Sequence, residues 1–332
     1  MISCTEFIPA YSEFFKYIDK KSGRQAVYDF WDALFQPGNS PLDGLISKYG
    51  KLRGCWENWY VVYTEEACDN TMLYNEEEGW MIGCMHHCPS KGRFNKLPHM
   101  EPFDEYCKHC SYYNIALEKK GFTKIVDYRG TENACCRSVL VDKARFKGDI
   151  QEMLDKMHQC EMNGCTARTT GCIFASEKTQ ELNTSPDDLK YLHPAFHLAM
   201  DAAAGYILDH YGEEGLKEYL TQYTLAYHIP LLEKIRQQGL AAVEEYIQGI
   251  YDFEEAADAL SMVRTEKELC VTIHYCPAVK FMKEVRNHTP HKAYEHCTDM
   301  VYEALAEAGG LGFEMISYDQ ETGAAKFRFF VN

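Results

Sequence analysis

Residues 80–110 read WMIGCMHHCPSKGRFNKLPHMEPFDEYCKHC and combine a strand-like start with a dense set of thiols and imidazoles. The apolar run 80–88 predicts a β-strand that stops at Pro89. Because alternate side chains of a strand share a face, Cys84, His86 and Cys88 are expected to project together. The CKHC sequence at 107–110 is expected to open a helix that follows the strand.

Thiolates and imidazoles in this pattern predict a site for a soft metal ion. Zinc is the metal that the ligand chemistry favours, with iron or an iron–sulfur cluster as the alternative. A structural interpretation stands beside it, in which the cysteines are small buried hydrophobic residues. The predicted metal ligands are Cys84, His86, Cys88, Cys107, Cys110 and Cys136.

Landmarks in the first part of the chain recur in the same order further on. Tyr17 and Gly23 match Tyr206 and Gly212 at an offset of 189 residues, and the sequence Cys-Pro recurs 188 residues after Cys88. Each copy reads as a helical half, a strand, a helix and two closing strands. The sequence therefore predicts an α+β fold of two tandem homologous repeats related by a pseudo-two-fold axis, each with helices on a small, mainly antiparallel sheet.

The predicted domains follow from these repeats. Residues 1–142 form the Cys/His-rich first repeat, residues 143–199 a connecting segment, and residues 200–332 the second repeat. Twelve of the fifteen cysteines lie before Ala175, so the metal is expected in the first repeat or its connecting segment. Residues 37–54 are expected to form a loop.

The connecting segment carries a second thiol cluster. Its sequence MHQCEMNGCTARTTGC places three cysteines among glycines that permit tight turns. These thiols are candidate ligands of a zinc ion or an iron–sulfur cluster, and scattered small cysteines are the alternative. The candidate cofactor-binding residues are Cys160, Cys165 and Cys172, which are expected to complete the site if the segment folds over the first repeat.

Three histidines are candidates for catalysis. His193 and His197 are four residues apart and would share one helical face if a single helix spanned them, with Asp201 one turn further on. Pro194 favours a helix that begins after His193, and buried core histidines are the competing interpretation. His109 in the CKHC sequence is a candidate proton carrier near neutral pH.

Composition excludes several classes of function. The formal net charge of −16 argues against nucleic acid and anionic membranes as partners. The acidic start of the chain does not resemble a signal peptide, and no apolar run reaches the length of a membrane span. Fifteen cysteines without an export signal favour reduced thiols in the cytoplasm. The expected partner is a small molecule, and the oligomeric state is left open.

The end of each repeat resembles the L-2-amino-thiazoline-4-carboxylic acid hydrolase-like family. The motifs are Cys88-Pro89, Cys110 and CRSV from Cys136, and again Cys276-Pro277, Cys297 and FRF from Phe327. The layout is also similar to 4-vinyl reductase-type ligand-binding domains, some of which bind zinc through cysteines in this region. The first resemblance implies hydrolysis of a small heterocycle containing carbon–nitrogen and carbon–sulfur bonds.

Two functions follow from these observations. The first is a cytoplasmic metal-dependent hydrolase or lyase for a small polar or sulfur- or nitrogen-containing molecule, in which the metal acidifies a water. The second is a small-ligand-binding or sensor protein with a structural zinc or iron–sulfur site. The expected pocket is bounded by His193, His197, the strand face of Cys84, His86 and Cys88, and tyrosines of both repeats.

Overall fold

The computed structural model describes residues 1–34, 42–167 and 169–331 of the chain. It divides into two compact units. Unit 1 consists of Met1–Tyr17, His99–Phe103 and Pro194–Asn332, and unit 2 of Ile18–Pro98 and Asp104–His193. The described residues form twelve α-helices and two separate antiparallel sheets, which confirms the predicted α+β class.

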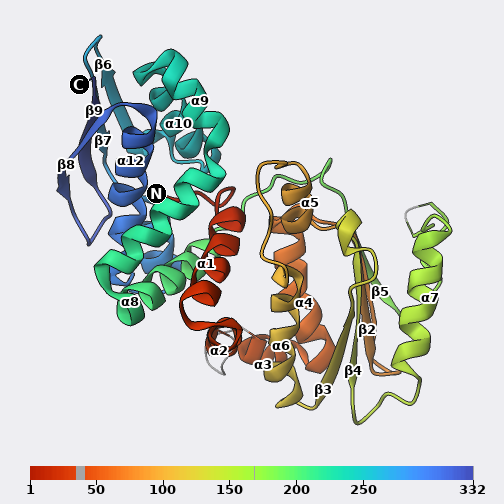
Figure 1. Ribbon diagram of the computed structural model, residues 1–332. Helices are drawn as coiled ribbons and strands as arrows, with labels where there is room; N and C mark the ends of the chain where they lie inside the picture. The colour runs from red at the N-terminus through yellow and green to blue at the C-terminus, as the bar shows by residue number, and fades with distance from the viewer. Residues whose placement is uncertain (35–41, 168, 332) are drawn as a thin grey trace. The chain divides into compact units, whose positions relative to one another are not determined.

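Unit 2 contains a five-stranded antiparallel sheet with the order β3-β4-β2-β1-β5 (Figure 1). The first four strands come from the first predicted repeat, and the fifth comes from the connecting segment and pairs with β1. The strands are β1 (Asp69–Asn75), β2 (Trp80–His87), β3 (Phe122–Asp127), β4 (Cys136–Asp142) and β5 (Gln180–Thr184).

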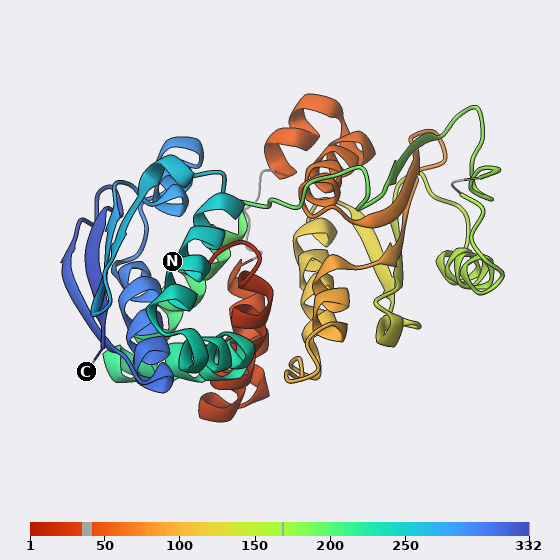
Figure 2. The same ribbon diagram turned by 90° about the horizontal axis from the view of Figure 1, so that it is seen from above.

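Helices cover both faces of this sheet. Helices α4 (Lys51–Glu65) and α6 (His109–Glu118) lie on one face, and α7 (Ile150–Met162) lies on the other (Figures 1 and 2). Along β2, Met81 packs in the α4 core, whereas Trp80 and Ile82 pack in the α7 core. Burial on both faces explains why β2 reads as an almost continuous apolar run.

Unit 1 contains a four-stranded antiparallel sheet with the order β6-β7-β9-β8 and helices on one face (Figure 1). In β9, Phe327 and Phe329 are fully buried and pack on Tyr302, while alternate residues face away. The strands are β6 (Leu260–Arg264), β7 (Glu268–Ile273), β8 (Gly312–Tyr318) and β9 (Ala325–Phe330). The main helices are α8 (Phe196–Tyr227), α9 (Ile229–Gln238), α10 (Leu240–Phe253) and α12 (His296–Gly309).

The two sheets share one topology, as the repeated landmarks predict. The order β3-β4-β2-β1 in unit 2 corresponds strand by strand to β8-β9-β7-β6 in unit 1. In both units a short helix follows the Cys-Pro sequence, namely α5 (Pro89–Asn95) and α11 (Pro277–Lys280). Strand β5 is the additional strand of unit 2 and belongs to the connecting segment.

Two matched glycines mark equivalent helix breaks. Gly23 has φ +83° and separates α1 (Phe7–Ser22) from α2 (Arg24–Leu34). Gly212 has φ +70° and ψ −173° and kinks α8 into two halves. A positive φ of this kind is readily adopted only by glycine, so the predicted pairing of Gly23 with Gly212 has a conformational reason.

Several predicted boundaries differ in the structure. Strand β2 ends at His87, and Cys88 becomes the N-cap of α5. The residues expected to form a loop at 37–54 instead contain α3 (Leu42–Tyr49) and the start of α4, while 35–41 lie outside the described residues. Gly54 explains the difference, because a Cβ at this position would lie 2.6 Å from the Cα of Ile46. Since glycine has no Cβ, α3 and α4 can pack closely at this point.

The segments that flank the repeats also differ from the predicted domains. Residues Met1–Tyr17 were expected in the first repeat and belong to unit 1, together with the second repeat. The connecting segment up to His193 belongs to unit 2. In the described part of the chain, no helix is both long and apolar enough to cross a membrane.

We expect Gly212→Ala to destabilise unit 1 by on the order of 1–2 kcal/mol, because an alanine at this φ and ψ is strained. Gly249→Ala is the matched control, since Gly249 lies inside α10 and an added Cβ would have no atom within 4 Å. That control should leave stability unchanged or raise it by roughly 0.5–1 kcal/mol. Urea unfolding followed by circular dichroism measures both, and equal effects would contradict the assigned kink.

Candidate functional site

A turn before α1 places Cys4 inside unit 1. The Glu6 side chain accepts a hydrogen bond from the backbone N–H of Ser3 at 2.9 Å, which is the reciprocal half of a capping box. Helix α1 then starts at Phe7, and the Cys4 side chain points into the unit. His197 is the second residue of α8, and Glu254 is the C-cap of α10.

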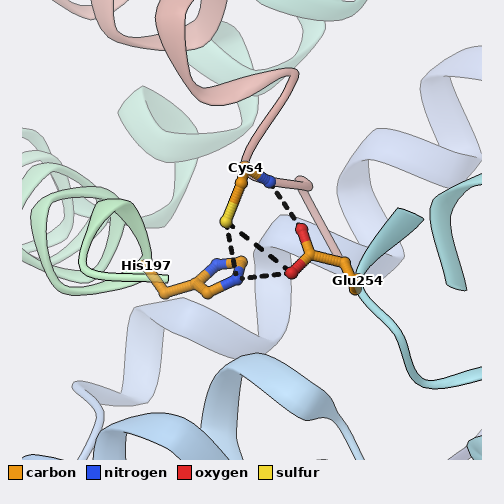
Figure 3. Close-up of side chains that lie close together, drawn as sticks. All are labelled: Cys4, His197 and Glu254. Carbon is orange, nitrogen blue, oxygen red and sulfur yellow. Dashed lines mark hydrogen bonds and ion pairs between the residues drawn. The ribbon is translucent and has the colours of Figure 1, made fainter. Parts of the chain in front are cut away.

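These three side chains converge on one point, as Figure 3 shows. The Cys4 sulfur lies 3.4 Å from Nε2 of His197 and 3.6 Å from Oε2 of Glu254. The same two atoms of His197 and Glu254 are 3.2 Å apart. Exposed fractions are 0% for Cys4, 2% for His197 and 8% for Glu254, so the group lies in the interior of unit 1.

The triangle of ligand atoms could hold a metal ion. Zinc bonds of about 2.3 Å to sulfur and about 2.0–2.1 Å to nitrogen and oxygen, at tetrahedral angles, imply ligand-to-ligand distances of about 3.3–3.6 Å. The observed distances of 3.4 and 3.6 Å lie within this range, and that of 3.2 Å lies just below it. A thiolate, an imidazole and a carboxylate can therefore hold one ion with a single position left over.

The remaining polar atoms of the group are held by neighbours. Oε1 of Glu254 accepts a hydrogen bond from the Cys4 backbone N–H at 2.6 Å. Nδ1 of His197 lies 3.3 Å from the hydroxyl oxygen of Tyr294, which can accept its proton and so leave Nε2 free to bind a metal. Such outer contacts orient the ligands of metal sites in proteins.

The charge of Glu254 also favours a bound cation. Burial opposes its ionisation, but the hydrogen bonds from His197 and from the Cys4 amide hold the pKa of this carboxyl below its usual range. An ionised carboxylate in the interior needs a positive partner, because isolated buried charges are strongly unfavourable. A metal ion or a protonated His197 can supply that charge.

A second group of candidate metal ligands lies in unit 2. It brings together residues of the strand motif at 80–88 and of the thiol cluster in the connecting segment. Nδ1 of His86, at the end of β2, lies 2.9 Å from Oε2 of Glu161 on α7. Cys165 follows α7 in the chain. The three side chains are close enough to hold a metal ion and are partly buried. Both His86 nitrogens have protein partners, since Nε2 lies 3.0 Å from the Thr71 hydroxyl. The connecting segment therefore packs on the sheet of the first repeat through α7.

The predicted thiol ligands divide between the two faces of the unit 2 sheet. Cys84 is buried in the core under α7, and Cys172 packs against that core. Burial, then the charge of Cys160, raises the pKa of Cys165 to about 11. Cys88 caps α5, so it does not share the face of Cys84 and His86. The other predicted thiol ligands lie on the side of α4 and α6. They are close enough for the charge of one thiolate to raise the pKa of another, and they are Cys88, Cys107, Cys110 and Cys136.

The histidine candidates occupy three different surroundings. His193 belongs to unit 2 and lies 2.6 Å from Oε2 of Glu65, whereas His197 belongs to unit 1. Helix α8 begins at Phe196 and leaves His193 outside it, as Pro194 indicated, so the two histidines do not share a helical face. His109 contacts the sulfur of Cys110. The pocket predicted to join His193, His197 and the Cys84 strand stays a prediction.

Sequence reasoning missed two of the three residues of the buried group. Glu254 lies in no cysteine- or histidine-rich motif, and Cys4 lies before the first landmark of the repeats. The Ser3-to-Glu6 capping signature was the available sign that Cys4 is fixed in a turn. The group also belongs to unit 1, whereas the thiols of residues 80–110, at which a metal was expected, belong to unit 2.

Comparison of the chain with protein-family models, with curated proteins and with solved structures finds no match. The function therefore has to be argued from the geometry of the two units.

Proposed function

We propose that this protein is a zinc-binding protein whose ion is held by Cys4, His197 and Glu254 and secures the N-terminal segment to α8 and α10. One observation carries the proposal, namely the convergence of three buried ligand atoms at distances that suit a tetrahedral ion. Thiolate ligation requires reduced cysteines, in agreement with the cytoplasmic location expected from composition.

The burial of the ligands favours a binding or sensing function over hydrolysis. All three are less than a tenth exposed, and their outer atoms are already held by Cys4 and Tyr294. An ion in this position would couple three segments that are distant in the chain, so its binding would order the N-terminal turn. We infer a small-ligand-binding or metal-responsive protein in which zinc stabilises the folded state of unit 1.

Anaerobic purification followed by elemental analysis tests the proposal. Wild-type protein is expected to contain about one zinc ion per chain at this site, and Cys4→Ser and Glu254→Gln are expected to lose it. Cys270→Ser is the matched control, because Cys270 is an exposed thiol of the same unit that lies outside the group. His86→Gln tests whether the second group contributes metal. Zinc retained by both Cys4→Ser and Glu254→Gln would contradict the assignment.

A metal-dependent hydrolase or lyase is the second candidate, and the ligand count favours it. Three protein ligands leave one position of a tetrahedral ion for water, as in catalytic zinc sites. Cobalt-substituted protein separates the two functions through its visible spectrum. A spectrum that changes on addition of azide indicates an open position and supports the enzyme, whereas an unchanged spectrum supports the closed, non-catalytic ion.

A further inference from the structure

Unit 2 carries a pair of cysteines at the start of α6 that the zinc proposal does not use. Cys107 lies in the short 3-10 turn Tyr106–Lys108, and Cys110 is the second residue of α6. Cys107 is partly buried and Cys110 is exposed. The pair therefore has the Cys-x-x-Cys spacing at a helix N-terminus, where backbone N–H groups stabilise a thiolate.

His109 is fixed between them as a partner of Cys110. Its Nδ1 donates a hydrogen bond to the carbonyl of Tyr106, and its Nε2 lies 3.7 Å from the Cys110 sulfur. The rings of Tyr106 and Trp31 pack on the imidazole, with centroid distances of 5.0 and 6.4 Å. Because Nδ1 carries the proton in that hydrogen bond, Nε2 of the neutral imidazole can take the proton of the Cys110 thiol.

The surroundings of the two thiols shift their pKa values in opposite directions. Desolvation by neighbouring atoms opposes ionisation of Cys110 even though the residue is exposed, and the contact with the His109 imidazole outweighs it and holds the pKa of this thiol below its ordinary value. Burial and then the charge of Cys110 raise the pKa of Cys107 to about 11. Cys110, which is exposed and contacts the His109 imidazole, is therefore the attacking thiol of the pair, and the partly buried Cys107 is the resolving thiol.

We propose that Cys107 and Cys110 form a redox-active dithiol that exchanges with disulfides of small thiols. The Cys110 thiolate attacks one sulfur of the substrate disulfide, which forms a mixed disulfide and releases the other half as a thiolate. Cys107 then loses its proton to that leaving thiolate and attacks the Cys110 sulfur. The second half of the substrate leaves as a thiolate and takes up the proton that His109 received from Cys110, so the substrate gains two electrons and two protons and the protein gains a disulfide.

Redox chemistry is favoured over metal binding at this pair. Among the described residues, the groups able to hold a metal ion are Cys4 with His197 and Glu254, and His86 with Glu161 and Cys165. Neither group includes Cys107 or Cys110. The dithiol also lies in unit 2, whereas the proposed zinc ion lies in unit 1, so the two proposals succeed or fail separately.

Oxidised glutathione is the probe for this proposal. Reduced full-length protein is mixed with it without oxygen, quenched with acid and analysed by peptide mass spectrometry. Wild-type protein is expected to form the Cys107–Cys110 disulfide, Cys107→Ser to retain one glutathione on Cys110, and Cys110→Ser to form neither. Cys270→Ser, which removes the exposed thiol of unit 1, is expected to behave as wild type.

The pH profile of Cys110 alkylation by iodoacetamide tests the role of His109 as a positioning residue. His109→Gln is expected to move the midpoint of the profile to higher pH and to slow the reaction at neutral pH by about tenfold for each unit of the shift. A histidine that only supports the fold would leave this midpoint in place.

Three outcomes would overturn the proposal. The first is that Cys110 reacts no faster than Cys270 in wild-type protein. The second is that Cys107→Ser resolves its mixed disulfide as fast as wild type, which would show that Cys88 or Cys136, and not Cys107, is the resolving thiol. The third is a zinc ion, found in wild-type protein and absent from both Cys107→Ser and Cys110→Ser, that blocks the reaction.

Discussion

Replacing His197 by alanine is expected to lower the free energy of unfolding of unit 1 by about 3–5 kcal/mol, the usual cost of stranding one member of a buried ion pair. His197 and Glu254 are both almost completely buried and lie 3.2 Å apart. Without the imidazole, the Glu254 carboxylate loses its partner and any metal loses a ligand. The two effects act in the same direction, so destabilisation is expected with or without zinc.

The tryptophans make this loss measurable for each unit. All four of them, Trp31, Trp56, Trp59 and Trp80, belong to unit 2. Tryptophan fluorescence in urea therefore reports on unit 2, while far-ultraviolet circular dichroism includes the long helices of unit 1. We expect His197→Ala to shift the circular dichroism transition of the unit 1 helices. A change in stability below about 1 kcal/mol would show that the contact resembles a surface ion pair.

Two variants serve as controls for His197→Ala. His193→Ala removes the other candidate histidine, but its partner Glu65 is 37% exposed, so about 1 kcal/mol or less is expected from this ion pair. The double variant His197→Ala with Glu254→Gln removes the charge that the single variant leaves unpaired. The double variant should be less destabilised than the single variant, and an equal or larger loss would contradict the electrostatic explanation.

Unit 1 is also expected to lose stability as the pH falls below about 6.5, because His228 is buried without a charge. His228 is 3% exposed, and burial lowers its pKa to about 3. Between these two values the unfolded chain binds a proton at this histidine and the folded chain does not. The free energy of unfolding therefore decreases with falling pH, by up to about 1.4 kcal/mol per pH unit.

The neighbours of His228 define the useful pH range. Oε1 of Glu6 lies 3.8 Å from its Nε2, and the hydroxyl of Tyr246 lies 3.5 Å from the same atom. Burial raises the pKa of Glu6, so protonation of that carboxyl favours the folded state at lower pH and acts in the opposite direction. The contribution of His228 is therefore best isolated near its ordinary pKa, from pH 7 to 5.

Urea unfolding of wild-type protein and His228→Gln across pH 7 to 5 measures this contribution. The wild type is expected to lose stability with a steeper slope than the variant, because glutamine takes up no proton in either state. Equal slopes would show that His228 is protonated in the folded protein and that the nearby Glu6 carboxylate stabilises its charge.

The repeated architecture could be predicted because its signals are local. Gly23 and Gly212 mark helix breaks through their own φ angles, and Cys88-Pro89 and Cys276-Pro277 end strands and start helices within a few residues. The apolar run at residues 80–88 likewise predicted a strand, which the structure has at Trp80–His87. Each of these features depends on residues close to it in the chain, so it can be predicted from the sequence.

The buried group could not be predicted in the same way, because long-range packing brings its residues together. Cys4 and Glu254 are 250 positions apart, and Cys4 and His197 are 193 positions apart. No spacing rule connects residues at such distances, and the dense cysteines of residues 80–110 directed the metal prediction elsewhere. The pairing of His86 with Cys165 similarly depended on how α7 packs against β4.

The sequence by itself determined the α+β class, the duplicated order of elements and the CKHC sequence that positions a thiol pair at a helix start. Only the tertiary structure decided that Cys84 is a core residue, that Cys88 caps a helix and that Cys4 meets His197 and Glu254. The physical reason is that backbone conformation and side-chain periodicity arise from residues a few positions apart. The environment of a side chain, and with it the charge and reactivity of that side chain, arises from whatever the folded chain packs against it.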